Sequence, residues 1–259
     1  MGKLHMGRYR ATLLVLGLCL LSAPLQAAEV WQDFKAYIRQ PAGWEKQQWL
    51  TLGGIALLTA TAIQYDESVR SGFAANQSAS GDQLAAIGNS WGELDSLGGL
   101  TLLSIYLGGE LKDDAGLVQL SANGLEAVVL GGVTTGIGKA LFGRTRPNAT
   151  TSAADWGQGG QSFPSGHTTM AFALSTVLAE SSDSPSLGRR LFFYSLASLT
   201  AYARMYDQKH WLSDTVAGAA IGINAGLFVV DRQRQAPAPQ QTQMLLLPNG
   251  IYFYRSFSS

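Results

Sequence analysis

The sequence predicts an all-α protein, a helical bundle of about six helices, on three observations. Apolar runs without charged residues recur along the chain at lengths suited to helices. Few segments show the strict alternation of apolar and polar residues that a half-buried strand requires. Charged residues make up only 14% of the 259 residues and hydrophobic residues 46%, whereas soluble domains have roughly 25% charge. The composition therefore excludes a disordered chain and indicates one domain with short appendages.

The chain opens with the features of a secretory leader, so we expect residues 1–28 to be a signal peptide. Three basic residues precede an apolar run over 11–21, and small residues follow at Ala27 and Ala28. The run is shorter than the ~20 residues that span a bilayer, which favours cleavage over the alternative of an uncleaved anchor. Cleavage would also remove Cys19, the single cysteine, so the mature chain would form no disulfide.

A helical domain is expected over residues 29–230. Apolar residues at helical spacing within 29–39 predict an amphipathic helix that stops near Pro41, with a face suited to a membrane surface or to packing on the bundle. The polar segment 66–92 predicts exposed helix and loop. The remaining helices are expected in the apolar runs 50–65, 96–109, 115–138, 168–180, 191–203 and 215–230.

Glycines recur every fourth residue in two of these helices, at Gly132 and Gly136 and at Gly218, Gly222 and Gly226. The spacing places a strip without side chains on one helix face and predicts close packing, as in membrane proteins or at glycine-lined crossings of soluble ones. Most uncharged runs, however, have only 13 to 16 residues, short of a comfortable membrane span. Mean hydropathy is only +0.08, so the sequence leaves membrane insertion open.

Residues 231–259 are expected to form a linker and a tail without chemistry. The stretch 231–243 is rich in Pro and Gln, as linkers often are. A Pro-Asn-Gly turn signal at 248–250 separates two short apolar segments. A small terminal hairpin is therefore predicted.

Outside the leader, the chain has two histidines, and each lies in a polar cluster. Ser165 and Gly166 precede the helix expected over 168–180, so Ser165 is placed as an N-cap and unpaired amides follow it. Free amides, a hydroxyl and a glycine together suit a phosphate group. His167, in the first turn, could protonate a leaving group. The alternative is a plain N-cap turn.

The second histidine, His210, stands four residues before Asp214. On a helix this spacing lets the carboxylate accept one ring N–H of the imidazole. The other ring nitrogen would then be unprotonated and basic, as in a Ser-His-Asp triad. A structural pair and a metal site are the alternatives, although no cysteine or third clustered histidine completes a metal sphere.

Two cations are predicted to face the same site from a third cluster. Lys139 and Arg146 are seven residues apart and return to almost the same helix face. Pro147 disfavours helix at Arg146, whose guanidinium would hang from the helix end. The alternative, which Arg144 fits well, is a basic helix end that complements the macrodipole.

Jointly the three clusters resemble the ordered motifs of the type 2 phosphatidic acid phosphatase (PAP2) and vanadium haloperoxidase superfamily. The motifs are Lys139…Arg146-Pro147, Pro164-Ser165-Gly166-His167 and Arg204…His210…Asp214. The resemblance covers about two-fifths of the chain, 132–230. One departure is Ala203, where the family usually has Ser before the arginine, so a hydrogen bond to phosphate is expected to be missing.

The resemblance implies a phosphatase that needs no metal and no cofactor. His210 would attack phosphorus and form a phosphohistidine, Asp214 would orient it, and His167 would protonate the leaving alkoxide before water releases phosphate. Positioning and charge neutralisation suffice for such a transfer. The residues implied to bind the phosphate oxygens are Lys139, Arg146, Ser165, Gly166 and Arg204.

Apolar helices beside the site favour a phosphorylated lipid as substrate, at the periplasmic face of the inner membrane. Phosphatidate, phosphatidylglycerol phosphate, undecaprenyl diphosphate and a lipid A phosphate are the candidates. The alternatives are a soluble periplasmic acid phosphatase for small phosphomonoesters, a vanadium-dependent haloperoxidase, and a membrane protein that binds phospholipid without catalysis. Lys+Arg and Asp+Glu both number 18, so nucleic acid is not an expected partner, and no protein partner can be inferred.

Overall fold

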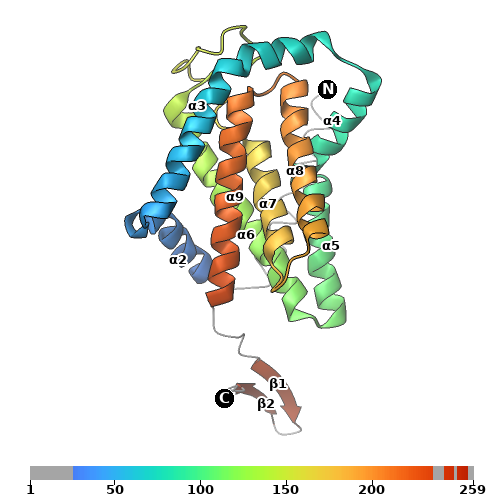
Figure 1. Ribbon diagram of the computed structural model, residues 1–259. Coiled ribbons are helices and arrows are strands. Elements are labelled where there is room, and N and C mark those ends of the chain that lie inside the picture. The colour runs from blue at the N-terminus through green and yellow to red at the C-terminus, as the bar shows by residue number, and fades with distance from the viewer. Residues whose placement is uncertain (1–25, 236–241, 248–249, 256–259) are drawn as a thin grey trace.

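The computed structural model describes residues 26–235, 242–247 and 250–255; most of the predicted leader lies outside this part of the chain. Within it the body of the protein is entirely helical, and the long helices run up and down beside one another (Figure 1). The predicted all-α fold class is confirmed. The described residues form eight α-helices, more than the six or so expected for the bundle.

The helices extend well past the uncharged runs that predicted them. In chain order they are α2 (Gln26–Arg39), α3 (Lys46–Ala75), α4 (Ala79–Trp91), α5 (Leu97–Lys112), α6 (Ala115–Phe142), α7 (Gly166–Glu180), α8 (Leu187–Tyr206) and α9 (Leu212–Gln235). A short 3-10 helix, η1 (Gln40–Gly43), follows α2 at the expected stop. α6 has 28 residues, which makes it about 42 Å long at 1.5 Å per residue. The short uncharged runs therefore do not limit helix length.

The polar segment 66–92 is largely the exposed helix and loop that its composition predicted, with a loop at 76–78, but Asp66 and one face of α4 are buried. α3 continues through its first part, and α4 occupies most of the rest. α4 packs along α8, and a Cβ at Gly88 would lie only 2.2 Å from the carbonyl oxygen of Leu199. Small residues allow this contact without an apolar pattern, so composition did not reveal it.

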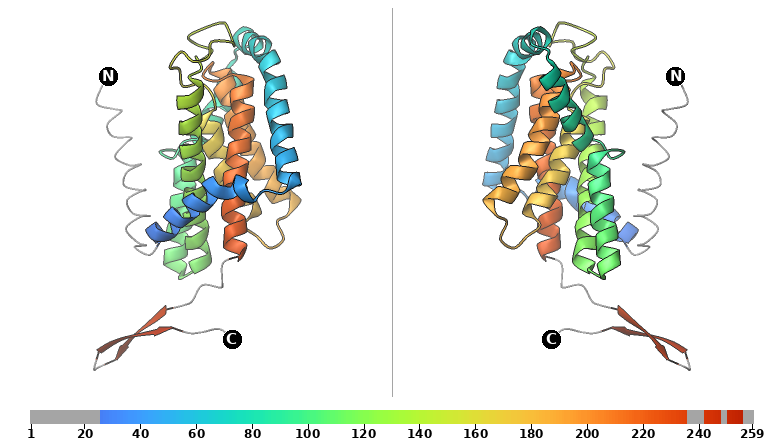
Figure 2. Two further views of the ribbon diagram at one scale, coloured as in Figure 1. Left: turned by 90° about the vertical axis from the view of Figure 1, so that its left-hand side faces the viewer. Right: turned by 90° about the vertical axis from the view of Figure 1, so that its right-hand side faces the viewer.

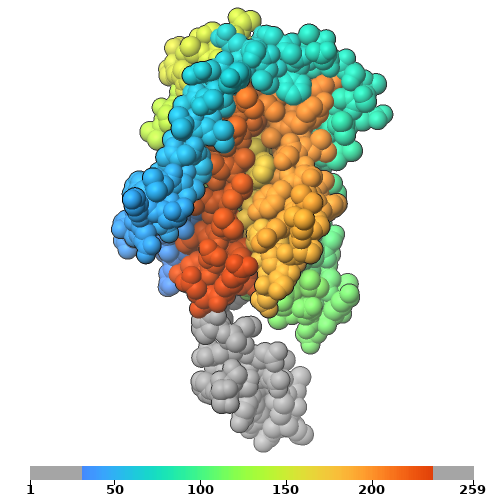
Figure 3. All heavy atoms as spheres, in the orientation of Figure 1, coloured from blue at the N-terminus to red at the C-terminus, as the bar shows by residue number. Residues whose placement is uncertain are grey.

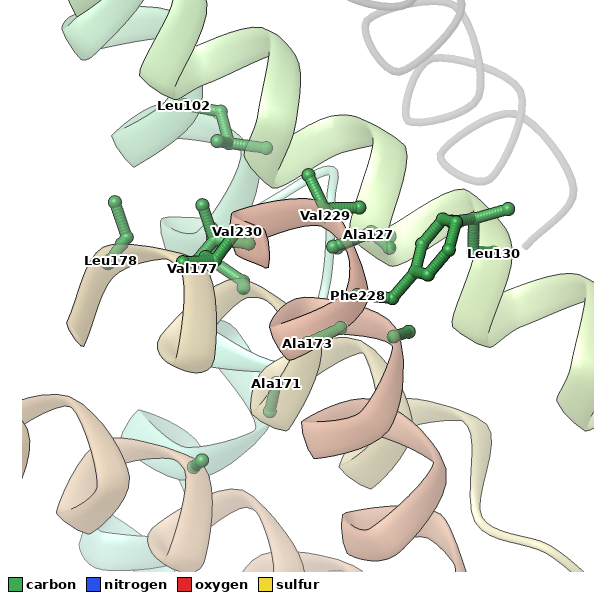
Figure 4. Close-up of a cluster of buried hydrophobic side chains, with 14 of the residues drawn as sticks. Leu102, Ala127, Leu130, Ala171, Ala173, Val177, Leu178, Phe228, Val229 and Val230 are labelled. Atoms are coloured by element: carbon green, nitrogen blue, oxygen red, sulfur yellow. The ribbon is translucent and has the colours of Figure 1, made fainter. Parts of the chain in front are cut away.

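α7 is the central helix of the bundle. Of its 15 residues, 11 are buried, and it packs against α6, α8 and α9. Figure 3 shows α8 and α9 covering most of it on one face. The core contains Ala173 and Val177 of α7, Ala127 of α6 and Phe228 of α9 (Figure 4). Three neighbouring helices therefore fix the position of the α7 N-terminus.

The glycine strips of α6 and α9 have different surroundings. In α9 the predicted close packing is confirmed, because a Cβ at Gly222 would lie 2.4 Å from the carbonyl oxygen of Thr169 on α7. In α6 it is wrong, because a Cβ at Gly132 or Gly136 would have no atom within 4 Å. That face of α6 points outward, and its Ile137 is 53% exposed.

The C-terminal part contains two strands beyond the bundle. β1 (Thr242–Leu247) and β2 (Gly250–Arg255) pair antiparallel, with Thr242 opposite Arg255. The linker expected from residue 231 begins later, since α9 continues through Gln235. The first proline of that stretch is Pro237, and nothing before it interrupts a helix.

Candidate active site

The segments that carry the predicted site residues meet at one end of the bundle. The loop from α6 to α7 and the short connection from α8 to α9 both lie at the upper end in Figures 1 and 2. The C-terminal part of α3 reaches the same end. Because neighbouring helices run in opposite directions, residues 139–146, 165–167 and 204–214 come together although they are far apart in the chain.

The start of α7 has the geometry of an anion site. Ser165 is the N-cap residue, as predicted, but its hydroxyl lies 2.9 Å from Thr168 Oγ1 and caps no amide. The first-turn amides therefore have no partner within the helix. At Gly166 a Cβ would meet Thr135 Cγ2 at 3.7 Å and Lys139 Cε at 3.9 Å. The lysine side chain thus passes beside the open helix end.

Lys139 and Arg146 do not share a helix face. α6 ends at Phe142, where Gly143 takes the left-handed conformation with φ of +53°, a common way for glycine to stop a helix. Arg146 consequently lies in the following loop. Lys139 Nζ donates to the carbonyl oxygens of Gln161 at 2.5 Å and Pro164 at 2.7 Å. Its ammonium group therefore also holds the loop that leads into α7.

His210 and Asp214 are in contact, though not on one helix. α9 begins at Leu212, so His210 precedes it, and the imidazole Nδ1 lies 3.4 Å from Asp214 Oδ2. That oxygen accepts shorter bonds from Ser162 Oγ at 2.5 Å and from the amide of Trp211 at 2.9 Å. Burial lowers the pKa of His210 to about 4, while the nearby carboxylate acts against the shift. The imidazole is therefore neutral at pH 7, as a nucleophile must be.

His167 lies half-buried in the first turn of α7. Burial lowers its pKa to about 3, and four further basic groups lower it too. These groups are Arg204, His210, Arg146 and Lys139. The imidazole of His167 therefore senses the charge of each of these groups. A bound phosphate dianion would counter those charges and raise the pKa of His167.

Glu93 and Asn89 are two site residues that the sequence analysis missed. Glu93 Oε1 lies 3.6 Å from His167 Nε2. Asn89, on α4, accepts a 2.7 Å hydrogen bond from Arg204 Nη1 and donates one of 2.7 Å to Asp207. Both residues belong to or follow the stretch first interpreted as exposed, and no local signal linked them to the motifs.

Arg204 presents an unused donor to the site. It is 8% exposed, and its Nε has no hydrogen-bond partner among the described residues. A buried donor without a partner is costly, and an anion would satisfy it. Ala203, the departure from the family pattern, is buried in a small cluster with Ala85 and Tyr206.

Arg144 is not the surface residue at a helix end that the sequence indicated. It is fully buried between two carboxylates, with Nη2 2.6 Å from Asp66 Oδ2 and Nη1 2.7 Å from Asp214 Oδ1. The rings of Trp156 and Trp211 lie 4.2 and 5.2 Å from the guanidinium carbon. Asp66 is 78 positions away in the sequence, so spacing could not predict the pair.

Comparisons with known proteins match part of the chain. A sequence model of the PAP2 superfamily matches residues 122–236. The chain is 36% identical over 108 residues to a lipid A 1-phosphatase of Porphyromonas gingivalis, an alignment that covers 42% of this chain and 22% of that protein. The chain thus spans about a fifth of that relative's length.

A solved structure shares the fold. The crystal structure of Aquifex aeolicus LpxE superposes with a TM-score of 0.50 over 64% of this chain and 94% of that one. The two sequences are 22% identical. At this level of identity the likeness concerns the arrangement of the helices.

Proposed function

The chain belongs to the PAP2 superfamily through residues 122–236, and on that premise we propose that it hydrolyses the phosphomonoester or diphosphate of a membrane lipid. One observation carries the proposal. A neutral imidazole, His210, contacts Asp214 and shares a site with His167 and with three cations, at the open end of α7.

The proposed binding step uses charge and free amides. The phosphate oxygens take hydrogen bonds from the first-turn amides of α7 and from the unused Nε of Arg204. Lys139 and Arg146 add positive charge, and Gly166 leaves room for the anion. Donors fixed before the substrate arrives stabilise the charge of the transferring phosphoryl group, which is the main requirement of this reaction.

In the proposed chemical step His210 attacks phosphorus with the ring nitrogen that does not face Asp214. The bond to the leaving oxygen breaks, and His167 gives that oxygen a proton. Water then attacks the phosphohistidine, with His167 accepting a proton from it, and phosphate leaves. Asp214 stabilises the positive charge that His210 carries as the intermediate forms. No step requires a metal.

The outer surface supports a lipid substrate. α6 and α9 are each long and apolar enough to cross a membrane, but 61% of the α9 window is buried in the bundle against 28% for α6. On α6 an outward stripe with a four-residue period is exposed by 39% to 74%, and it consists of Val129, Val133, Ile137 and Leu141. An apolar stripe of this size on a helix surface is suited to lipid contact.

Lipid A 1-phosphate is the first substrate to test, because the matched relative carries the name lipid A 1-phosphatase. The test is phosphate release by the purified protein from a panel of lipid and soluble phosphates, with EDTA present and with vanadate as inhibitor. We expect turnover of a lipid phosphate that vanadate blocks and EDTA does not.

Other outcomes would replace the proposal. Activity that a chelator abolishes and a divalent ion restores would contradict the metal-free mechanism. Turnover confined to soluble phosphomonoesters would favour a periplasmic acid phosphatase. Halide oxidation with added vanadate would indicate a haloperoxidase, and binding without turnover a lipid-binding protein.

A further inference from the structure

α3 places a buried carboxylate behind the candidate site. Asp66 is fully buried and lies outside the region that matches the family. Its Oδ2 accepts hydrogen bonds of 2.6 Å from Arg144 Nη2 and 2.6 Å from Ser213 Oγ, and its Oδ1 accepts the Ser213 amide at 2.9 Å. Asp66 thus joins the loop after α6 to the first turn of α9, where Asp214 lies.

Arg144 is shared between this carboxylate and the one that contacts His210. It donates to Asp214 Oδ1 at 2.7 Å and also to Ser213 Oγ and the Ala153 carbonyl oxygen. One buried guanidinium therefore faces two buried carboxylates. If Asp66 were uncharged, the whole charge of Arg144 would act on Asp214 alone and oppose its attraction for a positively charged imidazole.

We propose that Asp66 is a positioning residue for the reaction at His210: it balances the charge of Arg144, so that Asp214 keeps a net negative charge toward the imidazole. The inference rests on the proposed function of His210. It assigns to the N-terminal half of the chain a part in a site whose recognised motifs all lie in the other half.

The other groups that act on His210 come from the helices around it. The charged ones are Asp214 of α9, Lys139 of α6 and Arg204 of α8, and His167 of α7 is a further titratable group. None of them contacts Asp66 directly in the described structure. Burial raises the pKa of Asp66, and the bonds from Ser213 and Arg144 act against that rise. A change at Asp66 therefore alters the field at His210 while leaving its immediate neighbours in place.

The test is an NMR titration of the His210 ring in the purified parent protein and in two variants with opposite charge changes. The His210 signal is assigned by comparison with His167→Asn. Asp66→Asn keeps the shape and removes the negative charge, and we expect the His210 pKa to fall. Arg144→Gln removes the positive charge, and we expect the His210 pKa to rise. A shift of one unit is a tenfold change in the protonation equilibrium. The double variant should return to the parent pKa.

Glu67→Gln is the matched control. Glu67 is the next carboxylate along α3, but it accepts the amide of Ala153 at 3.0 Å, and a glutamine oxygen keeps that bond. We expect the His210 pKa of this variant to equal the parent value. Thermal unfolding of each variant establishes that it folds. If Asp66→Asn does not fold, the His210 pKa values of Arg144→Gln and of the double variant decide whether the inference holds.

Kinetics provide the second readout. Asp66→Asn should lower kcat with little change in KM, because the phosphate-binding groups remain. The inference is overturned if the His210 pKa is unmoved in the variants that fold, if both single variants shift it in the same direction, or if the double variant keeps a shift. The titration needs no turnover, so an inactive protein would contradict the proposed function while the NMR result still decides the inference.

Discussion

At the scale of single residues, the site combines two neutral imidazoles with three cations, Lys139, Arg146 and Arg204. His210 and His167 lose their protons because burial and the surrounding positive charge disfavour the imidazolium form. Arg204 keeps an unused Nε donor beside them. A phosphate dianion would satisfy the donors and allow His167 to take up the proton that a general acid needs.

The first prediction concerns the nucleophile. Quenched turnover should trap an acid-labile phosphoenzyme, and His210→Asn should abolish it and lower kcat by about 10⁴-fold or more, as for other covalent nucleophiles. Ser165→Ala serves as control, since it removes a proposed phosphate contact yet should still give the acid-labile label. An acid-stable label mapped to Ser165 would replace the histidine mechanism by a serine one.

The second prediction concerns pH and stability. Both histidines have a folded-state pKa below the unfolded value of ~6.5, so the unfolded chain binds more protons at acid pH. The contribution of these histidines to the free energy of unfolding is therefore fully present above that value. It falls as pH drops toward about 4, the folded-state pKa of His210. For His210 the loss amounts to about 1.4 kcal/mol for each pH unit.

Thermal unfolding between pH 4.5 and 7.5 measures this effect. His210→Asn should flatten the acid side of the curve, and added vanadate should protect the parent chain. An acid slope that is the same in parent and variant would contradict the assignment of the effect to His210.

At the scale of elements, the site depends on how closely α9 approaches α7. Three glycines of α9 face α7, and Gly218 lies so near the helix start that a Cβ there would be 2.6 Å from the carbonyl oxygen of Ser165. The amide of Ser165 in turn donates to the carbonyl oxygen of Asp214 at 3.0 Å. The same approach therefore sets the spacing between the anion site and the carboxylate.

The third prediction compares two glycines with the same sequence spacing. Gly222→Ala places a methyl group 2.4 Å from the backbone of Thr169, so the helices must separate, and overpacking of this kind costs about 1–3 kcal/mol. The methyl group of Gly136→Ala would have no atom within 4 Å. This change should stabilise α6 by up to about 1 kcal/mol, since Ala has a higher helix propensity than Gly. Thermal unfolding of both variants is the measurement. Equal shifts in the two would contradict the packing described here.

At the scale of the whole molecule, a buried polar centre coexists with an apolar outer surface. Fully buried polar side chains include Asp66, Arg144, Ser162 and Asp214, which bond to one another. On the outside, α6 exposes its apolar stripe, and α3 exposes Leu57 by 69%. This distribution fits a protein surrounded partly by lipid, with the site at one end of the bundle.

The fourth prediction is a membrane location with the site in the periplasm. After cell disruption the protein should remain with membranes through an alkaline wash. Thr151→Cys, in the exposed loop at the site end, should react with an impermeant maleimide in cells whose outer membrane is opened. Asp183→Cys, in the loop between α7 and α8 at the other end, should stay unlabelled. Release of the protein with the soluble periplasm would eliminate the membrane assignment.

Local sequence was sufficient for most of the helices, though not for their ends, and for the residues of each motif. Hydrophobic runs predicted most of the bundle. Ser165 was recognised as the N-cap position of α7 from the helical stretch that follows it, although its hydroxyl caps no amide. The pairing of His210 with Asp214 was also predicted, although the helix begins only at Leu212. Such features depend on neighbours in the chain, which a sequence displays directly.

Only the tertiary structure decided which surfaces meet. Gly136 and Gly222 share one spacing, yet one faces outward and the other touches α7. The sequence indicated a cation at a helix end for Arg144, yet its side chain is buried beside Asp66. Asp66 itself belongs to a segment whose composition predicted exposure. Whether a glycine or a charge is buried depends on which distant helix packs against it, and a buried charge becomes tolerable only when such a contact supplies its partner. That information lies between segments remote in sequence, so local pattern does not contain it.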